Sequence, residues 1–122
     1  MSASVNYLII TDAFATLQFN GQKAAAFGFE RDLQLNPQIR PILVWKANFK
    51  GDTVADLAYT VSLNGTVIHQ DAVSKKDIGK RSVHEMIAGD KLLPGQNRIK
   101  FEVIGGQGTL KVSDVYLMYH QV

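Results

Sequence analysis

Hydrophobic and polar residues alternate in short runs along this chain, a pattern typical of half-buried β-strands. The clearest run covers residues 42–49. In it Leu43, Trp45 and Phe49 share one face, whereas Lys46 falls on the other. We therefore predict a strand whose Trp45 face is buried in the core.

A hairpin is predicted downstream of this strand. Residues 57–63 alternate in the same way and lead to the pair Asn64-Gly65. Both central positions of a type I′ turn need a positive φ, which Asn and Gly tolerate. Residues 66–70 would then form the returning strand, and residues 50–52 are expected to be a turn.

The last third of the chain shows the strongest alternation. Residues 99–103 alternate up to a glycine-rich stretch at 105–108, where we expect a second hairpin. Its second arm covers residues 110–119. The apolar positions change phase at Ser113-Asp114, which indicates a β-bulge there.

The remaining segments are less regular. Three further strands are expected near residues 7–10, 15–19 and 25–29, and another at 83–87 that is followed by a turn. A cluster of basic residues before it is expected to form a solvated loop: Lys75, Lys76, Lys80 and Arg81. No stretch has the sustained spacing of an amphipathic helix of three turns.

Together these elements predict an all-β protein, an antiparallel jelly-roll β-sandwich of about eight strands. The chain has 122 residues, of which 46% are hydrophobic, and it has no cysteine. A chain of this size buries roughly two-thirds of its unfolded surface in one core, so disulfides are not needed for stability. We expect a single domain over residues 1–122.

Charge and hydropathy narrow the range of partners. Thirteen Lys and Arg against eleven Asp and Glu give a net charge of +2, far from the dense basic stripe of a nucleic-acid-binding protein. No apolar run approaches the ~20 residues that cross a bilayer, and the N-terminus has no basic leader region. We expect neither nucleic acid nor membrane as a partner, and a cytoplasmic location or export without a leader.

One motif in the last third carries a family resemblance. The run 92–99, Leu-Leu-Pro-Gly-Gln-Asn-Arg-Ile, is followed by the glycine-rich stretch and by a strand that opens near Asp114. It resembles the closing strands of galactose-binding-domain-like β-sandwiches, a superfamily that includes many carbohydrate-binding modules. The resemblance covers roughly the last 80 residues. It implies a jelly-roll fold and a binding role more often than a catalytic one.

The resemblance also implies a structural calcium ion. In several relatives this ion sits between an acidic residue near the first strand and the Asp that opens the last strand. Asp114 matches the second position, and Asp12 is the candidate for the first. No other cofactor is expected.

The sequence shows no recognisable constellation of catalytic residues. None of the serines lies in a Gly-x-Ser-x-Gly elbow, and most carboxylates fall at predicted turns rather than in facing pairs. His69, His84 and His120 lack the spacing of a metal site. His84 and Glu85 point to opposite faces of a strand. We therefore expect that the protein is not an enzyme.

The pattern favours a non-catalytic binding module, with carbohydrate as the leading ligand. Binding would use a sheet face or the rim loops, and the candidate residues are Arg31, Lys46, Asn48 and Tyr116. Tyr116 is preferred to Trp45 as an exposed aromatic, since Trp45 shares the buried face of its strand. The alternative is a structural or assembly protein, such as a homo-oligomer or virion-type subunit, that uses the same sheet face for protein contacts. A small enzyme ranks third.

Overall fold

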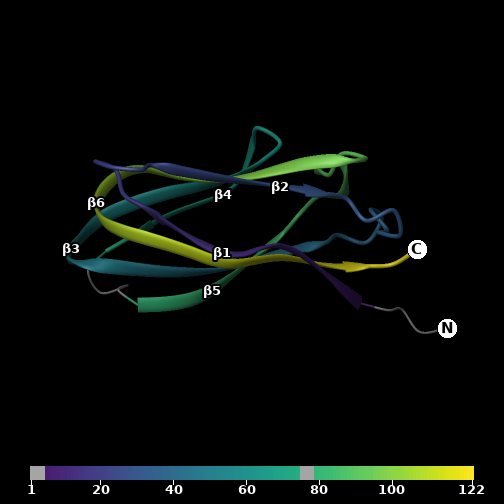
Figure 1. Ribbon diagram of the computed structural model, residues 1–122, viewed down its shortest axis with the longest axis horizontal. Coiled ribbons are helices and arrows are strands. Elements are labelled where there is room, and N and C mark those ends of the chain that lie inside the picture. The colour runs from purple at the N-terminus through teal and green to yellow at the C-terminus, as the bar shows by residue number, and fades with distance from the viewer. Residues whose placement is uncertain (1–4, 75–78) are drawn as a thin grey trace.

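The computed structural model describes residues 5–74 and 79–122, which are built almost entirely of antiparallel strands (Figure 1). The strands are β1 (Val5–Leu17), β2 (Ala24–Glu30), β3 (Ile42–Leu63), β4 (Thr66–Val73), β5 (Gly79–Met86) and β6 (Gln96–His120). A 3-10 turn, η2 (Gly89–Lys91), precedes β6. In these two ranges no helix is long and apolar enough to span a bilayer.

Two long strands, β3 and β6, run side by side through both layers of the molecule. The first half of β6 pairs with β2, and its second half pairs with β1. In β3, residues 42–49 pair with β5 and residues 57–63 pair with β4. One layer is therefore β2-β6-β3-β4, and the other is β1-β6-β3-β5, which we call the β1/β5 sheet. Figure 1 shows β3 and β6 curving from one layer to the other at its left end.

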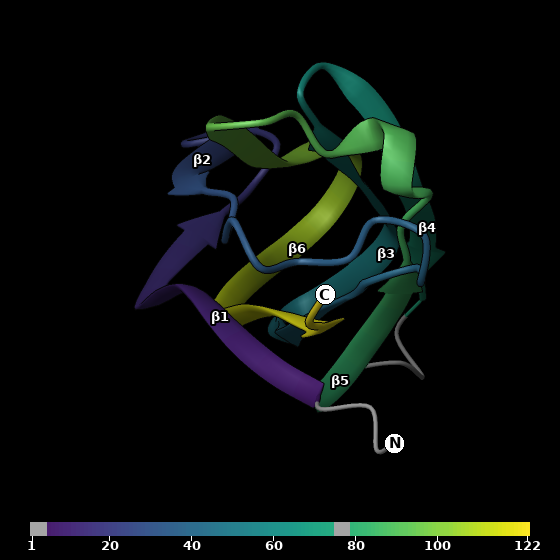
Figure 2. The ribbon, with the colours of Figure 1, turned by 90° about the vertical axis from the view of Figure 1, so that its right-hand side faces the viewer.

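The end-on view in Figure 2 places β1 and β5 on the lower side of the molecule and β2 on the upper side. The prediction of an all-β antiparallel sandwich is confirmed. Within the described residues the sandwich consists of six strands rather than about eight, because β3 and β6 each serve two layers.

The prediction of a hairpin at residues 105–108 is wrong. β6 continues through this segment, and both of its halves pair with β3 instead of with each other. Gly106 has a φ of 89°, and a Cβ there would meet the Asp56 carbonyl oxygen at 2.1 Å. The glycines therefore allow β3 and β6 to bend together in close contact. Glycine-rich stretches can thus form a bend within a strand as well as a hairpin turn. The turn expected at residues 50–52 is also wrong, since β3 continues through them.

The bulge predicted at Ser113-Asp114 is present. Asp114 has a positive φ of 50°, and the register between β3 and β6 shifts between Val44 and Lys46. The bulge keeps Val112 and Val115 both buried although they are three positions apart, an odd spacing that would place them on opposite faces of a regular strand.

The hairpin predicted at Asn64-Gly65 is also confirmed, with φ values of 52° and 87°. The Asn64 side chain joins this turn to the start of β6: its Oδ1 accepts from the Arg98 backbone N–H at 2.9 Å, and its Nδ2 donates to Asn97 Oδ1 at 2.8 Å. Asn97 is 3% exposed, and its side chain also bonds the Leu93 and Gly95 backbone. The Leu-x-Pro-Gly-x-Asn motif therefore acts as a structural clasp.

The core lies between the inner faces of the two layers. Trp45 is fully buried there, as its position in the alternating run predicted. Its ring lies 5.7 Å from the Phe101 ring, centroid to centroid, across the two layers. The other large, fully buried side chains are Tyr59, Phe49, Phe101, Leu17, Leu35, Leu43, Leu57, Leu63, Ile87, Ile99 and Leu110.

The less regular segments are strands of these same layers. Residues 7–10 and 15–17 belong to one strand, β1, and residues 83–86 lie in β5 ahead of η2. Lys80 and Arg81 are strand residues of β5, so a solvated loop is the wrong assignment for them. Lys75 and Lys76 lie outside the described residues.

Candidate functional site

The outer face of the β1/β5 sheet is organised in cross-strand rows, because antiparallel pairing sets residues of neighbouring strands directly opposite one another. In two neighbouring rows the side chains are mainly polar and basic. We call these the basic rows; they are Thr16, Lys111, Asn48 and Lys80, and then Phe14, Ser113, Lys46 and Ser82.

The next two rows toward the N-terminus of β1 are mainly apolar. We call these the apolar rows; they are Ile9, Tyr116, Val44 and His84, and then Tyr7, Met118, Ile42 and Met86. Several of their side chains are well exposed, including Tyr7 at 64% and Ile9 at 70%. The Tyr7 and Tyr116 rings lie 5.7 Å apart with an interplanar angle of 57°. One sheet face therefore carries the apolar rows, which include both tyrosines, next to the basic rows.

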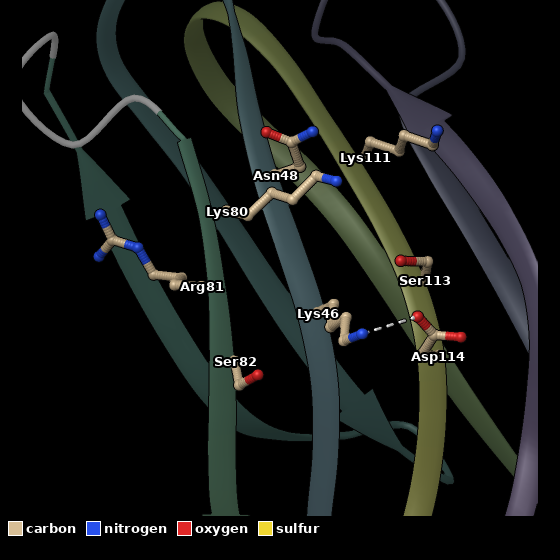
Figure 3. Close-up of a pocket in the computed structure, with 8 residues that line it drawn as sticks. All are labelled: Lys46, Asn48, Lys80, Arg81, Ser82, Lys111, Ser113 and Asp114. Atoms are coloured by element: carbon tan, nitrogen blue, oxygen red, sulfur yellow. Dashed lines mark ion pairs between the residues drawn. The ribbon is translucent and has the colours of Figure 1, made fainter.

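A hollow of about 310 Å³ lies over the basic rows. Figure 3 shows its lining from three strands: Lys46 and Asn48 on β3, Lys80, Arg81 and Ser82 on β5, and Lys111, Ser113 and Asp114 on β6. Asp114 is the single carboxylate among these residues. Its Oδ2 lies 3.4 Å from Lys46 Nζ, and both side chains are about half exposed.

The cations of the hollow differ in their surroundings. Lys111 Nζ lies 4.1 Å from the centre of the Phe14 ring, a cation–π contact. Arg81 lies over the Phe49 ring and extends away from the other lining residues in Figure 3. Within the described part of the chain, neither Lys80 nor Lys111 has a carboxylate within ion-pair distance.

The sequence-predicted binding residues do not all come together. Lys46, Asn48 and Tyr116 lie on one sheet face, in three consecutive rows. Arg31 lies elsewhere, in a hollow of about 340 Å³ that also includes Asp32, and its Nη2 donates to the Leu35 carbonyl at 3.4 Å. Arg31 is therefore not part of the site on the β1/β5 sheet.

The residues predicted to hold calcium are neighbours. Asp12 and Asp114 line one small hollow of about 230 Å³. Calcium takes six to eight oxygen ligands, and one of these carboxylates already pairs with Lys46. Among the described residues there is no group of three His, Cys, Asp or Glu side chains that could hold a metal ion. The two carboxylates alone therefore do not fit a calcium site, and the calcium ion stays a prediction.

Sequence reasoning missed Lys80, Lys111 and Ser113 as members of the hollow. Each lies at an outward position of its strand, but these positions are 31 to 33 residues apart along the chain between β5 and β6. Only the pairing of both strands with β3 brings them together. The alternation of Lys111 with Val112 predicts that Lys111 is exposed, but it does not predict that Lys111 lies in the same hollow as Lys80.

Two polar contacts between distant segments were also missed. His69 Nδ1 lies 2.9 Å from Glu85 Oε1, which joins β4 in one layer to β5 in the other. The Tyr119 hydroxyl donates to Asp32. This bond raises the pKa of Tyr119 to about 12 and lowers the pKa of Asp32 below its ordinary value, because the hydroxyl stabilises the carboxylate.

Comparison with known proteins rests on structure. No family model matches the sequence, and no curated protein matches it. Among solved structures, dimeric latent PorU from Porphyromonas gingivalis has a TM-score of 0.70 at 10% identity, over 99% of this chain and 13% of that one. A β-porphyranase of glycoside hydrolase family 86 from Bacteroides plebeius has a TM-score of 0.66 at 13% identity, over 98% of this chain and 21% of that one.

The two larger proteins are matched over only about an eighth and a fifth of their length. A family 35 carbohydrate-binding module from Clostridium thermocellum matches over 94% of this chain and 90% of its own, with a TM-score of 0.54 at 11% identity. The chain therefore shares its β-sandwich fold with this carbohydrate-binding module. At these identities the likeness concerns the fold, which confirms the resemblance seen in the sequence at that level.

Proposed function

We propose that the chain is a non-catalytic carbohydrate-binding module and that it binds its ligand on the outer face of the β1/β5 sheet. The fold supports this proposal, since a module of this kind matches the chain along nearly the full length of both. The face itself supports it further, because an aromatic half and a polar half adjoin there.

The observation that carries the proposal is the position of Tyr116 next to the basic rows. Tyr116 lies between Ile9 and Val44 in its row, and Lys46 and Ser113 occupy the next row. A sugar ring presents an apolar face that stacks on an aromatic ring and hydroxyl groups that bond polar side chains. The two halves of the face match these two needs.

The composition of the hollow supports binding rather than hydrolysis. Glycoside hydrolysis normally uses a pair of carboxyl groups that flank the bond to be broken. Among the described lining residues, Asp114 is the single carboxylate, and Lys46 lies within ion-pair distance of it. A lone, paired carboxylate is poorly suited to act as acid and nucleophile at once.

The test is a glycan-array screen of the full chain, followed by titration calorimetry with the best ligand. We expect Tyr116→Ala to weaken binding by at least about fivefold, since stacking on an aromatic ring contributes roughly 1 kcal/mol or more. The matched control is Phe19→Ala, which removes a partly exposed ring outside this face and should leave affinity unchanged. A folded chain that binds no glycan would overturn the proposal.

A second candidate is an assembly module, and the exposed side chains of the apolar rows favour it. Val5, Tyr7, Ile9 and Met86 are 49 to 70% exposed on one face. Large contiguous apolar patches often mark protein contacts. Light scattering distinguishes the two functions: a mass of twice 13.5 kDa that Ile9→Asp returns to 13.5 kDa would support assembly.

A further inference from the structure

The basic rows contain an arrangement that a neutral sugar does not require. Asn48 is flanked directly by Lys111 on β6 and by Lys80 on β5. Neighbouring strands lie about 4.8 Å apart, so the two lysine backbones are roughly 10 Å apart with Asn48 between them. Lys46 lies two residues from Asn48 on the same face, about 7 Å away along the strand. Three ammonium groups can therefore reach one point above Asn48.

The charges of this arrangement are not balanced. Three lysines face one carboxylate, Asp114, among the described lining residues of the outer face, an excess of two positive charges. This excess equals the net charge of the entire chain, +2. Like charges gathered on one face repel one another, and a cleft of one sign concentrates counter-ions. An anionic ligand group would relieve this repulsion.

We infer that the ligand is an anionic saccharide, whose sulfate or carboxylate group is bound by Lys46, Lys80 and Lys111 above Asn48. This inference rests on the proposed function and names its ligand class. A further sugar ring of the same oligosaccharide would lie on Tyr116, one row beyond Lys46 and roughly 14 Å along the strands from Asn48. Asn48 and Ser113 would bond ring hydroxyls, because both are polar and partly exposed in the rows between.

The side-chain positions fit an anion that arrives from outside. Lys111 Nζ rests on the exposed Phe14 ring, a contact that contributes only about 0.5 to 1 kcal/mol at an exposed site. A charged ligand can therefore draw Lys111 away from the ring at small cost. Arg81 does not take part, since it lies over Phe49 and extends to the other side of β5.

The face favours a saccharide over a nucleic acid. A nucleic-acid backbone is bound by a longer line of cations that follows its phosphates, with aromatic rings between the cations on which the bases stack. Here the cations occupy two rows, and the two tyrosine rings of the face lie together in the apolar rows. This geometry suits one or two charged groups next to a stacked ring.

The test compares ligand pairs in which one charged group is either present or neutralised or removed, by titration calorimetry with the full chain. One pair is an oligogalacturonate and its methyl ester, and the other is a sulfated galactan oligosaccharide and its desulfated form. We expect a charged form to bind at least about tenfold more tightly than its neutral form, and added salt to reduce this difference. The pair that shows the difference identifies carboxylate or sulfate as the bound group.

The variant for this test is the double substitution Lys46→Gln/Lys111→Gln, with Lys91→Gln as its control. Lys91 is exposed in η2, outside the hollow, so its loss changes net charge but not the site. The double variant should lose the preference for the charged form, and the control should keep it. Circular dichroism and thermal unfolding would establish that both variants are folded.

The outcomes separate the inference from the proposed function. Equal binding of charged and neutral forms overturns the inference and leaves carbohydrate binding standing. Binding of no saccharide by the folded chain overturns both. A single-stranded oligonucleotide of matched charge that binds as tightly as the charged sugar, through the same two lysines, also overturns the inference.

Discussion

The inner and outer faces of the β1/β5 sheet are made by the same strands but follow different rules. On the inner face of β3, Leu43, Trp45 and Phe49 are fully buried. On the outer face, Lys46 has a side chain that is 58% exposed and Asn48 is partly exposed. In β3 the inner positions from 43 to 49 are all apolar, whereas the outer face of the sheet divides into the apolar rows and the basic rows.

This difference separates positions whose side chains are needed for a stable core from positions whose side chains are available for binding. Apolar area removed from water contributes roughly 25 cal/mol per Å², so most inner positions of a strand are apolar. Exposed outer positions such as Lys46 contribute little to folding. The grouping of lysines in the basic rows therefore calls for a reason other than stability, and ligand binding supplies one.

The largest expected effect tests the contrast at two adjacent residues. Trp45→Ala should lower the free energy of unfolding by about 3 to 5 kcal/mol, because it leaves a large cavity between the layers. Lys46→Ala should change it by less than about 0.5 kcal/mol, since this side chain faces solvent. Urea denaturation followed by circular dichroism measures both.

The contrast would break down if both variants lost similar stability. That result would mean that the outer face contributes to folding as strongly as the core. Ser82→Ala, an exposed position in the row of Lys46, serves as a second outer-face control.

The next effect concerns the bend at Gly106, where β6 passes from one layer of the sandwich to the other. Gly106→Ala should cost about 2 to 4 kcal/mol, because the new Cβ would clash with backbone and the residue would keep a positive φ. The clash is with the Asp56 carbonyl oxygen on β3, at 2.1 Å. Thermal unfolding measures the loss.

Gly105→Ala is the matched control, since a Cβ there meets no atom within 4 Å and no left-handed φ is required. A Gly106→Ala variant as stable as this control would show that the two strands can bend without a close approach at the corner.

The smallest effect concerns an inner-face residue that reaches the rim. Tyr119→Phe removes the hydroxyl that lowers the pKa of Asp32, so this pKa should rise toward 3.8. The backbone N–H of Gln34 still bonds the carboxylate, at 2.8 Å, so the return should be partial. Carboxyl-carbon chemical shifts recorded against pH measure the change.

The sign of the pH dependence follows from the lowered pKa of Asp32. The bond stabilises the folded state above the unfolded pKa of Asp32, and this contribution is lost as pH falls through its folded pKa. As pH falls below about 4, the Tyr119→Phe variant should therefore lose less stability than the unmodified protein. An identical acid-side stability profile in both proteins would contradict this role.

The strands and their buried faces could be predicted because they depend on local alternation. The period of two placed Trp45 in the core, and Asn64-Gly65 marked its hairpin through φ alone. The glycines at 105–108 misled the same reasoning. Their freedom at φ permits either a hairpin or a sharp bend, and contact with Asp56 on another strand decides between the two.

The sequence by itself determined the all-β class, the apolar core and the outward phase of Lys46, Asn48 and Tyr116. Each of these depends on a residue and its near neighbours in the chain. Only the tertiary structure decided that Lys80 and Lys111 lie on either side of Asn48, because this requires the register of β3 with two other strands. Burial sets the phase of each strand locally, whereas pairing between distant strands sets which outward side chains share a site.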